Sequence, residues 1–194
     1  MIGASTTERM FTMKVKRMVN IGIFAALTAV CAQISFVIPF TTIPFSMVIL
    51  AVFLCGAILS PLDAFLAQAV YILVGAIGLP VYAQFSGGPG VLFGMTGGYI
   101  FAYLAMTPVV ALFAKHLKNH LYPALLAGMT VALLICYTVG TVWYVIITQA
   151  NFITGLSLCV VPFVVPDVIK IIVAASLALA LRKALTKARL YEAA

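Results

Sequence analysis

The chain has 194 residues, of which 65% are hydrophobic and only 8% are charged, and its mean hydropathy is +1.24. A soluble domain of this length cannot bury so much apolar surface, so the composition excludes a soluble enzyme or binding module and indicates a membrane protein. At about 20 residues per spanning helix, the length permits roughly six or seven spans in one transmembrane domain over residues 1–194.

Apolar runs separated by proline, glycine and basic clusters predict an all-α protein with six transmembrane helices. We expect these helices over residues 18–38, 44–60, 62–79, 96–114, 122–147 and 161–184. Segment 80–95 is too rich in proline and glycine to continue a helix. Segment 148–160 gathers small polar residues, Asn151 among them.

Basic clusters set the orientation of the predicted helices. They precede the first helix, separate the fourth from the fifth and follow the sixth, so all lie on one side of the membrane. The positive-inside rule makes that side cytoplasmic and places both termini there. The net charge of +7 is therefore a topology signal and not a sign of nucleic-acid binding. Segments 80–95 and 148–160 carry no charge and are expected outside.

The first helix contains the small-residue motif Ala25-x-x-x-Ala29. Small residues four apart let another helix approach closely. The motif predicts either packing inside the bundle or a surface that docks a partner membrane protein.

The outer segment 80–95 contains Tyr82, Phe85, Ser86, Gly87 and Gly88. Glycines allow tight turns and a close approach of the backbone to a ligand. The segment is not a phosphate loop, because no Gly-Lys-Ser/Thr sequence follows it. It is expected to be either a lid over a small ligand or a connector.

Two opposite charges lie inside the last predicted helix, at Asp167 and Lys170. Each costs about 2.5–3.5 kcal/mol to insert at the centre of a membrane helix, and residues three apart share one helix face. Lys170 precedes Arg182 by roughly 18 Å of helix, which places the pair in the outer half of the membrane. A solute-binding site is favoured over a structural salt bridge or a proton relay.

Signatures of catalysis are missing from the sequence. It holds no nucleophile with a matching base, no metal-ligand spacing and no ATP-binding loop, so we expect neither enzymatic activity nor a cofactor. Asp63, near the start of the third helix, is expected to cap that helix. Active transport would therefore need an energising partner or an ion gradient.

At this point the sequence resembles the BioY family, the biotin-specific substrate-binding (S) components of energy-coupling factor transporters. The resemblance covers nearly the whole chain. It rests on four motifs in order: Ile43-Pro44, Gly78-Leu79-Pro80-Val81-Tyr82 with Phe85-Ser86-Gly87-Gly88, Thr96-Gly97-Gly98-Tyr99, and Pro166-Asp167 with Ile169-Lys170.

The resemblance implies a six-helix S-component fold in the bacterial plasma membrane and a biotin site at its outer side. It implies that Asp167 accepts from a ureido N–H and that Lys170 donates to an oxygen of biotin. That oxygen can belong to the ureido group or to the carboxylate at the other end of the ligand. Further contacts are expected from Tyr82, Phe85, Ser86, Tyr99 and Asn151, beside Gly87 and Gly88.

The same resemblance implies partners. Ala25 and Ala29 would dock a transmembrane coupling subunit that is connected to two cytoplasmic ATPases. The alternative hypothesis is an autonomous ion-coupled carrier of a small solute, in which the charged pair exchanges protons.

Overall fold

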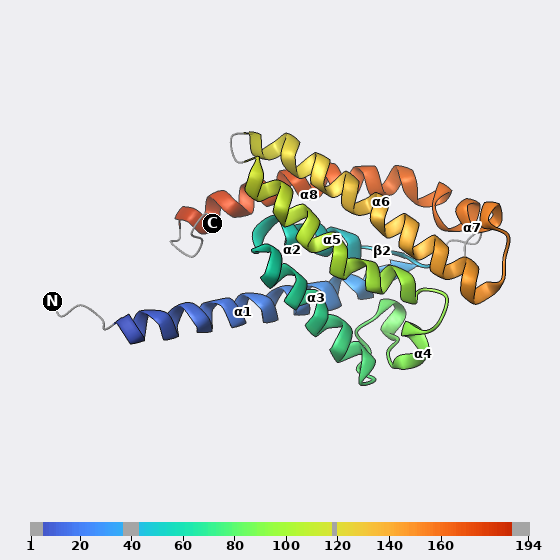
Figure 1. Ribbon diagram of the computed structural model, residues 1–194, viewed down its shortest axis with the longest axis horizontal. Helices are drawn as coiled ribbons and strands as arrows, with labels where there is room; N and C mark the ends of the chain where they lie inside the picture. The colour runs from blue at the N-terminus through green and yellow to red at the C-terminus, as the bar shows by residue number, and fades with distance from the viewer. Residues whose placement is uncertain (1–5, 37–42, 118–119, 188–194) are drawn as a thin grey trace.

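The computed structural model describes residues 6–36, 43–117 and 120–187, with side chains from residue 14 onward (Figure 1). The chain is a bundle of helices with one short pair of strands. In chain order the elements are α1 (Thr6–Gln33), β1 (Ser35–Phe36), β2 (Phe45–Ser46), α2 (Val48–Ile58), α3 (Pro61–Ala76), the 3₁₀ turn η1 (Ala83–Phe85), α4 (Pro89–Leu92), α5 (Gly97–His116), α6 (Leu121–Thr148), α7 (Phe152–Cys159) and α8 (Val161–Lys187).

Each predicted span contains a helix, but several ends differ from the prediction. α1 begins at Thr6 instead of residue 18, because the polar residues ahead of the apolar run include good helix formers. α3 ends at Ala76 instead of residue 79, because Gly78 takes a left-handed conformation with φ of 101° just after it. The two uncharged segments are only partly irregular, since η1 and α4 lie in one and α7 in the other.

Strands β1 and β2 lie where the sequence predicts the end of the first helix and the start of the second. They pair antiparallel, with Ser35 opposite Ser46 and Phe36 opposite Phe45. α2 therefore starts only at Val48, after β2. Residues 37 and 38, also predicted as helix, lie outside the described residues.

Within the described residues, four helices are long and apolar enough to cross a membrane, by length and composition. They are Lys14–Gln33 within α1, and α5, α6 and α8. The apolar helices α2 and α3 are shorter, with 11 and 16 residues. At about 1.5 Å per residue neither reaches the ~30 Å of a bilayer core, so the count of six spans stays a prediction.

α2 forms the centre of the bundle and is buried along most of its length. It packs against α1, α5 and α8, and hydrophobic residues cover its whole circumference. A helix that is apolar on all sides is stable only in such an interior position. β2 leads directly into α2, so this short strand is held against the core of the protein.

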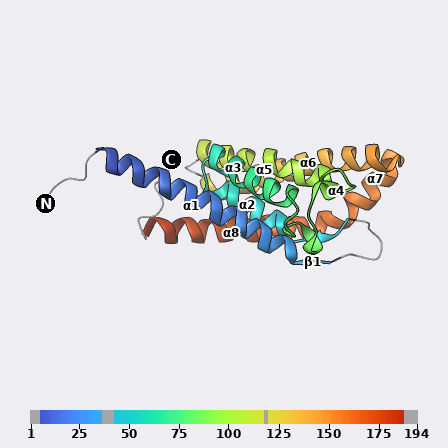
Figure 2. The ribbon, with the colours of Figure 1, turned by 90° about the horizontal axis from the view of Figure 1, so that it is seen from below.

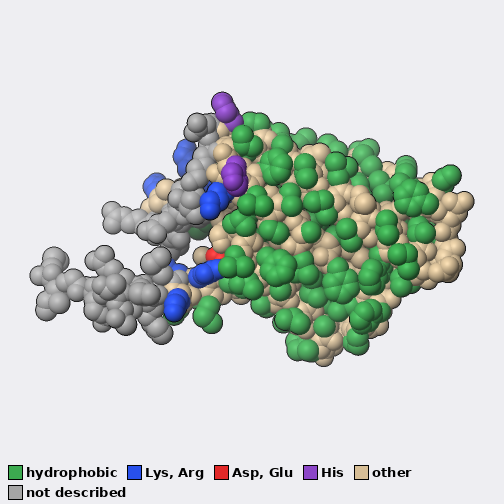
Figure 3. Space-filling view, viewed as in Figure 1, with side chains coloured by type: hydrophobic (Ala, Val, Ile, Leu, Met, Phe, Trp, Pro, Cys, Tyr) green, Lys and Arg blue, Asp and Glu red, His purple; other side chains and the backbone are tan. Residues whose placement is uncertain are grey.

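The two ends of the bundle differ in charge. The N-terminal part of α1 and the C-terminal part of α8 lie at one end, whereas α4 and α7 lie at the other (Figures 1 and 2). Lysine, arginine and histidine side chains gather at the first end (Figure 3). This arrangement agrees with the predicted shared side for the basic clusters; which side of the membrane it faces stays a prediction.

Asp63 lies at the charged end and pairs with Arg17 of α1. The sequence analysis expected Asp63 to cap α3, but the N-cap is Ser60, whose hydroxyl oxygen accepts from the Asp63 backbone N–H at 3.3 Å. The Ser60 hydroxyl also donates to the Asp63 carboxylate at 2.9 Å. Asp63 therefore supports the cap and links α3 to α1.

Candidate functional site

The Asp167–Lys170 pair forms a buried ion pair within α8. The Lys170 Nζ lies 2.9 Å from the Asp167 Oδ1, and the two side chains are 5% and 0% exposed. The i, i+3 spacing brings the two groups to one helix face, as the sequence predicts. Burial at this depth leaves both charges dependent on protein partners.

Both members of the pair have further partners. The Tyr137 hydroxyl of α6 donates to the Asp167 Oδ2 at 2.7 Å. The Lys170 ammonium donates to the Ser46 carbonyl of β2 at 2.8 Å and lies 3.9 Å from the centre of the Phe45 ring. The carboxylate thus has a donor on each oxygen, and the ammonium is engaged on three sides.

The aromatic rings around Phe45 hold β2 in place. Phe45 lies between Phe36 of β1, at a centroid distance of 4.9 Å, and Phe163 of α8, at 6.5 Å. Such ring pairs contribute about 0.5–1.5 kcal/mol each beyond the area they bury. β2 is therefore fixed to α8 by a ring contact, a cation–π contact and a charge-assisted hydrogen bond.

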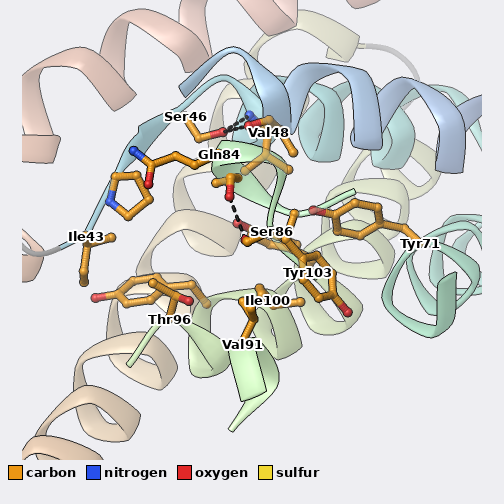
Figure 4. A pocket seen from close by; sticks show the side chains of 15 residues that line it. Ile43, Ser46, Val48, Tyr71, Gln84, Ser86, Val91, Thr96, Ile100 and Tyr103 are labelled. Carbon is orange, nitrogen blue, oxygen red and sulfur yellow. Dashed lines mark hydrogen bonds between the residues drawn. The ribbon is translucent and has the colours of Figure 1, made fainter. Parts of the chain in front are cut away.

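A pocket of about 290 Å³ lies beside β2 (Figure 4). Its walls come from β2 and the residues before it, the loop around η1, and helices α1 to α5. The lining residues are Ala32, Ile43, Pro44, Ser46, Val48, Tyr71, Tyr82, Ala83, Gln84, Ser86, Val91, Thr96, Tyr99, Ile100 and Tyr103. Ser46 belongs both to this wall and to the partners of Lys170, so the charged pair lies directly behind the pocket.

Two glycines make room for aromatic walls of the pocket. A side chain at Gly75 of α3 would collide with the Tyr82 ring, and one at Gly140 of α6 would collide with the Tyr99 ring. The Tyr82 hydroxyl donates to the Ile72 carbonyl at 2.7 Å. Burial raises the pKa of Tyr82 to about 12, so its phenol stays a neutral donor at physiological pH.

Comparison with known proteins places this geometry in a family. A sequence model of the BioY family matches residues 5–187. The chain belongs to the BioY family.

Relatives of the chain cover most of its length. It is 36% identical to the probable biotin transporter BioY of Pyrococcus horikoshii, over 80% of this chain and 90% of the relative. It is 39% identical to the biotin transporter BioY of Thermotoga maritima, over 77% and 85%. The crystal structure of an S-component for biotin from an ECF-type ABC transporter has the same fold, with a TM-score of 0.82, 24% identity, and coverage of 89% of this chain and 93% of that one.

Within this BioY fold, the predicted contact residues separate into three groups. Tyr82, Ser86 and Tyr99 line the pocket, whereas Asp167 and Lys170 lie behind its wall. The other four lie in segments 80–95 and 148–160 and do not line the described pocket: Phe85, Gly87, Gly88 and Asn151.

The residues outside the pocket have local structural reasons for their positions. Phe85 has a φ of 54° and a side chain that is 71% exposed, so it points away from the lining. Gly88 takes a φ of 89° and donates to the Gly75 carbonyl at 2.7 Å, and a side chain at Gly87 would collide with the Leu79 carbonyl. The Asn151 side chain accepts from the Ile153 backbone N–H as the N-cap of α7. For Phe85 and Asn151, the ligand contact stays a prediction.

The residues of the predicted docking motif on α1 are largely covered by the rest of the bundle. Ala25 is only 7% exposed and belongs to the main core, and Ala29 is partly buried against that core. On the same helix Gly22 and Ala26 are exposed, and open space surrounds the position of a side chain at Gly22. Ala25 thus packs inside the bundle, which was one of the two alternatives for this motif.

Several residues of the pocket lining and of the charged pair's surroundings were not predicted. Tyr103 follows Tyr99 by four residues on α5 and therefore shares its helix face, a signal that could have revealed it. Tyr137 lies on α6 and is 30 residues before Asp167, its hydrogen-bond partner. Ser46 contacts Lys170 through its backbone carbonyl. Neither of these roles leaves a recognisable pattern in a single sequence.

Proposed function

We propose that this chain is the biotin-binding S component of an energy-coupling factor transporter and that it captures biotin in the pocket beside β2. The observation that carries the proposal is the position of the Asp167–Lys170 pair directly behind a pocket-lining residue. The names of the P. horikoshii and T. maritima relatives point to the same ligand.

The chemistry of the pair suits the ureido ring of biotin. A ureido group offers N–H donors and one carbonyl acceptor, and Asp167 and Lys170 offer a carboxylate acceptor beside an ammonium donor. A carboxylate ligand suits the site less. The Asp167 carboxylate lies 2.9 Å from the Lys170 ammonium and would repel a second carboxylate that bound there. The proposed orientation therefore directs the ureido ring to the pair and the carboxyl chain to the pocket mouth.

Existing partners of the pair stand in for ligand groups under this proposal. The Ser46 carbonyl accepts from Lys170, as a ureido carbonyl would. The Tyr137 hydroxyl donates to Asp167, as a ureido N–H would. Because Ser46 forms part of the pocket wall, a shift of β2 would let the ligand exchange with that carbonyl. Charge-assisted bonds of this kind are roughly twice as strong as neutral ones and favour the exchange.

The remaining lining suits the apolar part of biotin. Tyr82, Tyr99 and Ile100 offer ring and aliphatic surface for the thioether ring and the chain, and Ser86 adds a hydroxyl. Among the described residues, the groups of three or more His, Cys, Asp or Glu that a metal would need are not found. Binding without a metal or cofactor is part of the proposal.

Transport would require partners in the plasma membrane. We place the docking face for a transmembrane coupling subunit on the exposed side of α1, around Gly22 and Ala26 with Ala29 at its edge. Two cytoplasmic ATPases would energise the complex from the end that carries both termini and the basic residues. The alternative, an autonomous ion-coupled carrier, needs no such partners.

Calorimetric titration of the purified chain with a panel of vitamins tests the binding proposal. We expect heat of binding with biotin and none with riboflavin or thiamine at the same concentration. Tight binding of another vitamin in the absence of biotin binding would refute the assignment. The assignment would also be refuted if no vitamin in the panel bound.

A further inference from the structure

The pocket presents neutral polar groups to its ligand. Among the lining residues that the structure describes, none has a charged side chain. In the sequence, residues 18–166 contain only three Asp, Glu, Lys or Arg residues, namely Asp63, Lys115 and Lys118. Asp63 pairs with Arg17 of α1, Lys115 lies in the last turn of α5, and the sequence of residues 37–42 contains no acidic or basic residue.

Among the described residues, Lys170 is a cation whose hydrogen-bond partner lines the pocket, and its charge is already paired within the protein. Lys170 is 5% exposed and contacts Asp167, the Ser46 carbonyl and the Phe45 ring. Its charge is balanced by Asp167 at 2.9 Å, so the pair has no net charge to offer a ligand anion. An ionised carboxylate entering this neutral site would lose hydration without gaining a cation.

Neutral hydroxyl groups supply the unused hydrogen-bonding capacity. Within the described part of the chain, the hydroxyls of Tyr71 and Tyr103 have no hydrogen-bond partner, although both residues are buried and line the pocket. Both lie at the end of the pocket away from Ile43 (Figure 4). A phenol can donate and accept, so these groups complement a neutral ligand with both donors and an acceptor.

We propose that the pocket recognises the neutral ureido and thioether rings, that the carboxyl group gains no cationic partner, and that carboxyl-modified biotin compounds are therefore also ligands. The proposal rests on the proposed biotin function and specifies its ligand class: compounds with an intact ureido ring whose carboxyl group is an amide or an ester. A cation-based site would instead reject them, since loss of a charged hydrogen bond leaves the cation unpaired.

Competition with labelled biotin tests the proposal on the full chain in detergent. Biotinamide and biotin methyl ester are expected to bind within about fivefold of biotin. As a matched control, biotin methylated on a ureido nitrogen keeps its carboxylate and should bind at least about thirtyfold more weakly. Losses above about tenfold for both the amide and the ester would overturn the inference.

Salt dependence gives an independent readout. Raising ionic strength from about 0.05 to about 0.5 M weakens recognition of an anion by an accessible cation, because screening reduces their attraction. Here the biotin affinity should change less than about threefold over that range, and a larger loss would contradict neutral recognition. If labelled biotin itself does not bind, the proposed function fails; if it binds and the modified compounds do not, the inference alone fails.

Discussion

The most informative perturbation removes the charges of Asp167 and Lys170 singly and together. Lys170→Met leaves a fully buried carboxylate with Tyr137 as its donor, and Asp167→Asn leaves a buried ammonium without its counter-ion. Removing one partner of a buried pair costs about 3–5 kcal/mol. For a chain of this size, 1 kcal/mol corresponds to roughly 2–4 °C, so each single variant should melt about 6–20 °C lower.

The double variant Asp167→Asn/Lys170→Met separates stability from binding. It contains no unpaired charge, the Asn amide can still accept from Tyr137, and Met fills most of the lysine volume. We expect its melting temperature to recover to within about 4 °C of the parent. Biotin affinity should nevertheless stay at least ~2 kcal/mol weaker, about thirtyfold, because the ligand loses its charged partners.

The assay combines thermal unfolding in detergent with calorimetric titration of the same samples below their melting temperatures. A double variant that is as stable as the parent and binds biotin equally well would refute a role in recognition and leave a structural salt bridge. A double variant less stable than either single one would refute the charge-pairing argument instead.

Three further predictions use other parts of the molecule. Asn151→Ala should cost about 1 kcal/mol of stability through loss of the α7 cap, and biotin affinity should be unchanged in the same titration. A large loss of affinity would show that Asn151 contacts the ligand. Ala25→Trp should lower the melting temperature because it overpacks the core, whereas Ala26→Trp should keep both stability and biotin binding and abolish co-purification with a coupling subunit. Liposomes that contain this chain alone should take up no biotin under a pH gradient, and gradient-driven uptake would favour the ion-coupled carrier.

The sequence carried the fold class because its signals are repeated along the chain. Long apolar runs, interrupting prolines and basic clusters each indicate a bundle of membrane helices. Errors at single helix ends therefore did not change the predicted fold class. The strands β1 and β2 escaped prediction because two-residue strands are too short to show a period of two. Their pairing depends on contacts with α8 that are distant in sequence.

The candidate site was predictable at its charges and much less at its walls. Asp167 and Lys170 stood out because lipid disfavours charge, and the structure brings them together as expected. Asn151 did not stand out as a cap, because a polar residue before an apolar turn fits a cap and a ligand contact equally well. The contribution of Ser46 is a backbone carbonyl, which every residue has and no pattern marks.

The most direct test of the account is an experimental structure of the chain with biotin bound. We predict the ureido ring in the pocket beside β2, within hydrogen-bonding distance of Asp167 or Lys170, with the Ser46 carbonyl displaced from the ammonium and the carboxyl group at the mouth. A biotin carboxylate seated on Lys170, or a ureido ring bound away from the pair, would contradict it.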